Sequence, residues 1–112
     1  LENLIYEGKE YNVKKWRELL PTVCEILYDI DSNTLNTATI DNTIHKATSK
    51  QRYNEKDPIL CSVPNYLVDP IKLKNANIYV EGCISSDRTR YYVKQILDLY
   101  GLTDRFQICV RG

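Results

Sequence analysis

Methionine is absent from the 112 residues, and histidine, tryptophan and phenylalanine occur once each. We expect a chain without methionine, even at its first position, to be a piece of a longer protein. The chain also lacks an apolar run of the ~20 residues needed to span a bilayer, and its start shows no signal-peptide pattern. These absences predict a cytoplasmic protein that makes no membrane contact.

Net charge is absent too, because 15 basic residues are balanced by 15 acidic ones. Bulk charge therefore does not attract nucleic acid, and any such contact must come from a local patch. Apolar residues make up 43% and charged residues 27% of the chain, which is ordinary for a folded globular domain. We expect one domain over residues 1–112, burying about two thirds of its unfolded surface.

Metal-binding and disulfide patterns are sparse. His45 is the only histidine, and zinc sites usually bring paired ligands at short spacing. The cysteines are Cys24, Cys61, Cys83 and Cys109, with no Cys-x-x-Cys pair. We expect half-buried thiols in a reducing compartment, with a disulfide or a metal as the alternative.

Catalytic motifs are equally scarce. Glu7-Gly8-Lys9 has the Glu-x-Lys spacing of metal-dependent nucleases, but only Glu2 precedes it as a further carboxylate. The four glycines are scattered, so no phosphate-binding loop is formed. The sequence thus predicts no catalytic residues, no metal site, no cofactor and a protein that is not an enzyme.

The clearest pattern is a strand, a helix and a second strand near the C-terminus. Residues 77–84 read as a strand, and Ser85 or Ser86 then suits the N-cap of a helix. Apolar side chains recur at helical spacing over 86–100. Alternation from Phe106 to Val110 predicts a strand with one buried face.

The end of that helix has its own signal. Gly101 suits the left-handed conformation that closes a helix, and Leu102 follows where a Schellman cap makes its apolar contact, here with Leu97. We therefore expect the helix to stop at Tyr100.

The N-terminal residues 4–13 predict a β-hairpin. Gly8-Lys9 suits a two-residue turn that begins with glycine. This register pairs Tyr6 with Tyr11 across the strands.

A broad apolar stripe from 14 to 30 predicts the first long helix, with Asn12 as a possible N-cap and Trp16 in the core. Pro21 interrupts it, because proline removes one helical hydrogen bond and clashes with the carbonyl of Arg17. Either a kinked helix or a short helix running into a second one fits this pattern.

The segment 31–57 is rich in polar residues and predicts a surface loop or weak helices that add little to the core. Ser32 suits the cap of a short helix through Ala38, and Asp41 that of another through Ala47.

These elements predict an α+β domain in which two principal helices, 14–30 and 86–100, pack on a small, largely antiparallel sheet. Short strands bounded by prolines are expected at 59–63 and at 71–73, the latter paired with 78–80. The predicted core comprises Trp16, Leu20, Val23, Leu27, Val80, Val93, Ile96, Leu97, Phe106 and Ile108.

Nine tyrosines in a neutral chain favour a binding role, because tyrosine is enriched at protein interfaces. The first hypothesis is a non-catalytic protein-interaction or oligomerisation module, whose partner is another protein or a second copy. The alternative is an accessory nucleic-acid-binding domain, because helix N-termini and cations bind phosphates. Its candidate residues are Ser85, Ser86, Arg88, Arg90, Lys46, Lys50 and Arg52.

Four stretches also resemble a known class of modules. Val13–Leu20, Ile78–Glu81, the Ser85-Ser86 cap and the Gly101-Leu102 helix end look like small accessory α/β modules of bacterial restriction and other DNA-defence proteins. The resemblance covers both ends of the chain and leaves out 31–57. It implies a cytoplasmic bacterial or mobile-element protein with catalysis elsewhere in the parent chain, and it assigns a function to no residue.

Overall fold

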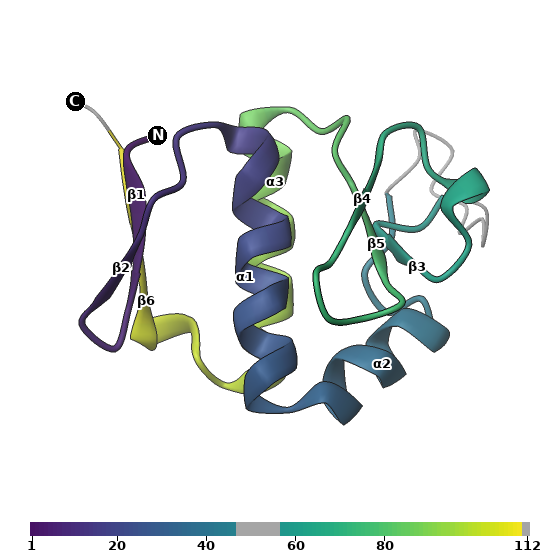
Figure 1. The fold of residues 1–112 in the computed structure, drawn as a ribbon, viewed down its shortest axis with the longest axis horizontal. Coiled ribbons are helices and arrows are strands. Elements are labelled where there is room, and N and C mark those ends of the chain that lie inside the picture. Colours follow the sequence, from purple (N-terminus) through teal and green to yellow (C-terminus); the bar gives the residue numbers. More distant parts are fainter. Residues whose placement is uncertain (47–56, 111–112) are drawn as a thin grey trace.

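The computed structural model describes residues 1–46 and 57–110, and it has three layers (Figure 1). Two long helices lie side by side in the middle, with one three-stranded sheet on each side of the pair. The first sheet has the order β2-β1-β6 and the second β3-β5-β4, both antiparallel. The elements are β1 (Asn3–Tyr6), β2 (Lys9–Tyr11), α1 (Trp16–Ile30), α2 (Ser32–Ile40), β3 (Leu60–Cys61), β4 (Pro70–Lys72), β5 (Tyr79–Glu81), α3 (Ser86–Tyr100) and β6 (Phe106–Cys109).

The α+β class and its two principal helices are confirmed, and the strands divide between two sheets. The terminal strands β1 and β6 pair with each other, so both ends of the described chain lie on one side of the helices (Figure 1). The strands of the middle region pair among themselves on the other side, with Ile71 opposite Val80 as expected. Pro58 and Pro64 lie on either side of β3 and Pro70 begins β4, and each strand of this sheet spans only two or three residues.

The N-terminal hairpin forms, but its predicted register is wrong. The turn residues are Glu7 and Gly8, with φ of 51° and 79°, and Tyr6 lies opposite Lys9. A turn with positive φ at both central residues matches the right-handed twist of the strands, and glycine suits the second position. Tyr6 therefore does not pair with Tyr11, and its ring stacks on Phe106 of β6 at 4.4 Å between centroids.

The first long helix is continuous through Pro21, so it does not split into two helices. It begins at Trp16 after Lys15, so the prediction of Asn12 as N-cap is wrong. The Glu18 carboxylate accepts a hydrogen bond from the backbone N–H of Lys15 at 3.3 Å, which fixes this start. Trp16 itself is half-buried at the edge of the core.

The prediction that the segment after α1 adds little to the core is wrong. Asp31 caps α2 by accepting hydrogen bonds from two backbone N–H groups, and the helix runs to Ile40. Leu35 and Ala38 are buried because α2 packs on α1 and β3, and Ile44, which follows this helix, is buried too. No helix follows over 41–46, so the second predicted helix is wrong there, and Ala47 lies outside the described residues.

The second long helix has the caps that the sequence indicates. The Ser85 hydroxyl accepts the Arg88 N–H at 3.3 Å. At the other end Gly101 has φ of 67°, its N–H bonds the Asp98 carbonyl, and the Leu102 N–H bonds the Leu97 carbonyl, both at 3.1 Å. This pair of bonds is the Schellman motif, and it turns the chain toward β6.

The core lies between the helix pair and the two sheets. Most of the predicted core is buried, and Trp16, Phe106 and Ile108 are partly buried at its edge. The predicted residues that are buried are Leu20, Val23, Leu27, Val80, Val93, Ile96 and Leu97.

Candidate protein interface

A carboxylate is buried at the end of β5. Glu81 is 1% exposed, and a buried charge is stable only when it is paired and hydrogen-bonded. Its Oε1 accepts hydrogen bonds from the Val68 N–H at 2.9 Å and from Nζ of Lys46 at 3.0 Å. Its Oε2 accepts the Asp69 N–H at 2.8 Å and the Cys83 N–H at 3.1 Å. Both oxygens are thus satisfied, and one carboxylate joins three separate segments.

These contacts decide the charge state of Glu81. Burial acts to raise the pKa of this carboxyl, but the hydrogen bonds from Val68, Asp69, Lys46 and Cys83 outweigh it and leave the pKa below its ordinary value. The carboxylate is therefore ionised at neutral pH, in the form that accepts all four bonds.

A second ion pair fixes the same segment from the other side. Arg17 of α1 donates two hydrogen bonds to the Asp69 carboxylate, at 2.8 and 3.0 Å, a bidentate geometry that orients both groups. The Asp69 carbonyl accepts the Gly82 N–H at 2.7 Å. A side chain at Gly82 would place its Cβ 2.5 Å from Oδ2 of Asp69. Glycine at position 82 therefore allows the residue after β5 to lie close to Asp69, the residue before β4.

Between β3 and β4 lies a segment that we call the apolar loop, residues 62–69. Its buried member is Leu67, and it contains one turn of 3₁₀ helix, Pro64–Tyr66. Three of its apolar side chains point to solvent, with Val63 41%, Tyr66 47% and Val68 73% exposed. The loop is thus closed at its C-terminal end by Glu81 and Arg17 while it presents apolar surface outward.

This combination suggests what the loop does. Burying a carboxylate costs solvation that its partners must offset, and exposed apolar side chains gathered in one place mark contact surfaces. Holding such a loop rigid lowers the entropy lost when it binds another surface. The loop therefore has two features in common with protein contact surfaces, which are exposed apolar side chains and a backbone held by hydrogen bonds.

The residues predicted for anion binding are brought together only in part. Lys46, Ser85 and Arg88 line one hollow of about 240 Å³ beside Cys83. The ammonium of Lys46 is already paired with Glu81.

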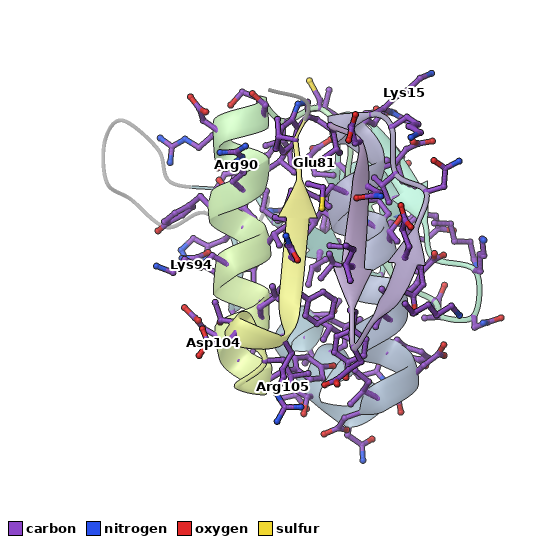
Figure 2. All side chains as sticks on the ribbon, turned by 90° about the vertical axis from the view of Figure 1, so that its left-hand side faces the viewer. Lys15, Glu81, Arg90, Lys94, Asp104 and Arg105 are labelled. Atoms are coloured by element: carbon purple, nitrogen blue, oxygen red, sulfur yellow. The ribbon has the colours of Figure 1, made fainter. Side chains whose placement is uncertain are left out.

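The other predicted residues lie elsewhere. The Arg90 guanidinium lies over the Trp16 ring, 5.0 Å from its centroid, and Ser86 is exposed in the first turn of α3. Lys50 and Arg52 fall outside the described residues. Figure 2 shows Arg90 and Glu81 at the end of the molecule where both long helices begin.

Sequence reasoning missed Glu81, Arg17 and Asp69 as a set. Glu81 is one of 15 acidic residues in the sequence, and its position at the end of an apolar strand is the only sequence signal that sets it apart. Its cation is 35 residues away in sequence, and the partners Arg17 and Asp69 are separated by 52. Pairings of that range form only when the tertiary structure brings distant segments together.

Other chemistry has little support in the described residues. Among residues 1–46 and 57–110, no group of three or more His, Cys, Asp or Glu side chains is placed to hold a metal ion. None of the four cysteines forms a disulfide, and burial raises the pKa of the Cys24 thiol to about 12. No helix in these two ranges is long and apolar enough to cross a membrane.

Comparisons with protein-family models, with curated proteins and with solved structures find no match to this chain. The resemblance to accessory modules of DNA-defence proteins therefore stays a prediction.

The Glu81 contacts predict a pH-dependent stability difference. Because the folded-state pKa is lowered, the carboxylate contributes stability above its ordinary pKa of about 4.3 and loses it as pH falls through the folded-state value. Glu81→Gln should lower the free energy of unfolding by about 3 kcal/mol at pH 7. That difference from the unmodified protein should shrink below about pH 4. Urea unfolding across pH measures it, with the exposed Asp87→Asn as the matched control. A difference that stays constant down to pH 2.5 would contradict the assignment.

Proposed function

We propose that this domain is a non-catalytic protein-binding module whose contact surface is the apolar loop. The observation that carries the proposal is the exposure of Val63, Tyr66 and Val68 on a segment that a buried carboxylate and a bidentate ion pair hold in place. Loops without such bonds are usually mobile, and this one is bonded through both of its last two backbone N–H groups.

The chemistry of the loop suits a binding surface. Tyrosine is among the residues that dominate binding energy at interface centres, where the ring is buried and its hydroxyl finds a partner. Complete burial of a valine side chain contributes about 1.5–3 kcal/mol. Tyr66, with Val63 and Val68 close to it in sequence, therefore offers one exposed aromatic ring and two exposed apolar side chains on the same loop.

The titratable side chains give further support. The ring of His45, the single histidine, has Nδ1 3.0 Å from the Asn42 carbonyl, and Lys46 pairs with Glu81. Both side chains already make contacts within the fold, which favours a binding role over an acid–base one.

Site-specific photo-crosslinking in the cells that produce the protein tests the proposal. A benzoylphenylalanine at position 68 should give one recurring adduct, with another protein or with a second copy. The matched control places the same group at Ile40, which is 82% exposed on α2, and should give none. Tyr66→Ala should lower the affinity for the partner captured at position 68 by about tenfold or more. Equal adduct patterns at both positions, or none at position 68, would overturn the proposal.

A second candidate function, an accessory nucleic-acid contact, is favoured by one observation. Lys46, Ser85 and Arg88 line a single hollow at the start of α3. In the part of the chain that the structure describes, the Arg88 guanidinium has no hydrogen bond or ion pair, so its charge is available to a phosphate. The hollow is lined by two cations, Lys46 and Arg88, and Glu81 neutralises the first of them. Because only the Arg88 charge remains for a phosphate, protein binding is the first proposal.

Anisotropy of labelled single-stranded and duplex DNA tests this second candidate. Phosphate contacts release counterions, so affinity should fall steeply with salt, and Arg88→Ala should reduce the salt slope by about one. Arg105→Ala at the opposite end of the molecule (Figure 2) is the matched control and should change nothing. Absence of binding at low salt, or an affinity that ignores salt, would exclude a phosphate contact.

A further inference from the structure

The outer edge of strand β6 carries backbone groups that pair with no described strand. Over residues 1–46 and 57–110, β6 pairs with β1 alone and lies at the edge of the first sheet. Free N–H and C=O groups at a sheet edge form a template for another strand. Figure 2 shows β6 in yellow between β1 and α3, so a strand added at this edge would lie in front of that helix.

The hairpin fixes which backbone groups of β6 point toward β1. In a two-residue hairpin, the residues on either side of the turn form a hydrogen-bonded pair, here Tyr6 and Lys9. Such pairs alternate with non-hydrogen-bonded pairs along an antiparallel ladder, and each residue's N–H and C=O point to the same side. The backbone groups of Ile5 therefore point away from β2 and bond Gln107 of β6.

The backbone groups of the alternate residues point to the free edge. Cys109 follows Gln107 by two residues, and its carbonyl accepts the Glu2 N–H at 2.8 Å, on the β1 side as the alternation requires. The residues between and beside these two present their N–H and C=O groups outward. They are Phe106, Ile108 and Val110.

The other edge strands carry features that discourage pairing with a further strand. Among the four edge strands that the structure describes, β2 contains the exposed charges of Lys9 and Glu10, β3 spans two residues just before Pro64, and β4 begins at Pro70. Charges, prolines and short length are the devices that keep sheet edges apart. The sequence of β6 is Phe-Gln-Ile-Cys, with neither a charge nor a proline. This edge is therefore the one suited to receive a strand.

The side chains of β6 are complementary to a reversed copy of themselves. If two copies pair antiparallel about a two-fold axis at Ile108, Phe106 lies opposite Val110 and Gln107 lies opposite Cys109. Phe106 and Ile108 pack at the edge of the core, and Val110 is 44% exposed. This register covers each Val110 with the other copy's Phe106, and it pairs every outward backbone group of both strands.

Charges beside β6 favour the same reversed arrangement. Figure 2 shows Arg90 and Lys94 along α3, and Asp104 nearer the start of β6. All three side chains are exposed. A two-fold axis reverses the second copy, so the basic part of one copy faces the acidic part of the other.

Neighbouring charges leave this pattern in place. Asp87 lies one helical turn before Arg90, and with Lys94 following, this part of α3 keeps a net positive charge. Asp98 lies one turn after Lys94 and adds to the acidic part. Arg105 is already paired with Glu7 at 2.7 Å.

We propose that β6 pairs with β6 of a second copy of this chain, antiparallel about a two-fold axis at Ile108. The two first sheets then form one continuous sheet, and such an isologous contact closes at the dimer. A second copy is favoured over a strand of another protein because both the side chains and the charges of this edge match their own reversed copy. The proposal does not depend on the apolar loop and is tested separately from it.

A disulfide across the predicted pair tests the register. Gln107→Cys places a thiol opposite the native Cys109 of the other copy, in a non-hydrogen-bonded pair whose Cα atoms lie about 4.5 Å apart, within disulfide range. Oxidised glutathione should then give a dimer with a 107–109 link between chains, identified by peptide mass spectrometry. Glu10→Cys, on the edge strand β2, is the matched control and should give no link to Cys109. Absence of the 107–109 link, or equal linking from position 10, would overturn the proposal.

Sedimentation equilibrium of the reduced protein tests the dimer itself. Val110→Asp places a carboxylate opposite Phe106 of the other copy and should weaken the dimer by about tenfold or more. Ile40→Asp makes the same change at a side chain that is 82% exposed on α2 and should leave the dimer unchanged. A strict monomer at millimolar concentration, or equal weakening by both variants, would overturn the proposal.

A charge exchange tests the reversed orientation. Lys94→Glu and Asp104→Lys should each weaken the dimer by about threefold at low salt. The double variant restores opposite charges between the two copies and should recover the original affinity. A double variant that dimerises no better than either single variant would contradict the antiparallel arrangement.

Discussion

The buried carboxylate of Glu81 is the interaction on which the second half of the structure depends. It lies at the end of the central strand of the second sheet and accepts hydrogen bonds from three backbone N–H groups and one ammonium. Removing one partner of a buried, hydrogen-bonded charge leaves the other uncompensated, so losing any of these contacts destabilises the fold. Arg17 carries the same constraint across to α1 through Asp69. Glu81 thereby couples the second sheet to the helix layer.

The consequence for function is a loop that is fixed and apolar at once. Burial of the exposed side chains Val63, Tyr66 and Val68 would be favourable in free energy. The backbone hydrogen bonds to Glu81 nevertheless keep the end of the loop in place. A surface already ordered before binding loses less entropy on association.

Local signals in the sequence were sufficient for the elements whose structure is decided locally. The spacing of apolar residues predicted both long helices, and Gly101 with Leu102 predicted the Schellman cap. The predicted hairpin turn, Gly8-Lys9, was misplaced by one residue. The turn is formed by Glu7 and Gly8, and glutamate rarely adopts the positive φ that Glu7 has here. The role of Leu35 was missed, because a short polar helix gains its burial only from tertiary packing.

The candidate interface could not be predicted in the same way. Its determinants are contacts between residues far apart in the chain, such as Glu81 with Lys46 and Arg17 with Asp69. No local pattern marks a carboxylate that will be buried, since glutamate is ordinarily exposed. The prediction that Ser85 caps α3 was correct, because capping is decided by neighbouring residues. The grouping of Lys46 with Ser85 and Arg88 could not be predicted, because it depends on tertiary packing.

Amide hydrogen exchange at Val68 and Asp69 tests the central claim most directly, because Glu81 is the acceptor for both N–H groups. If Glu81 holds the apolar loop, these two amides should exchange orders of magnitude more slowly than an open loop, approaching the protection of the β5 strand itself. Exchange at the rate of an unstructured segment at neutral pH, while β5 remains protected, would contradict the account.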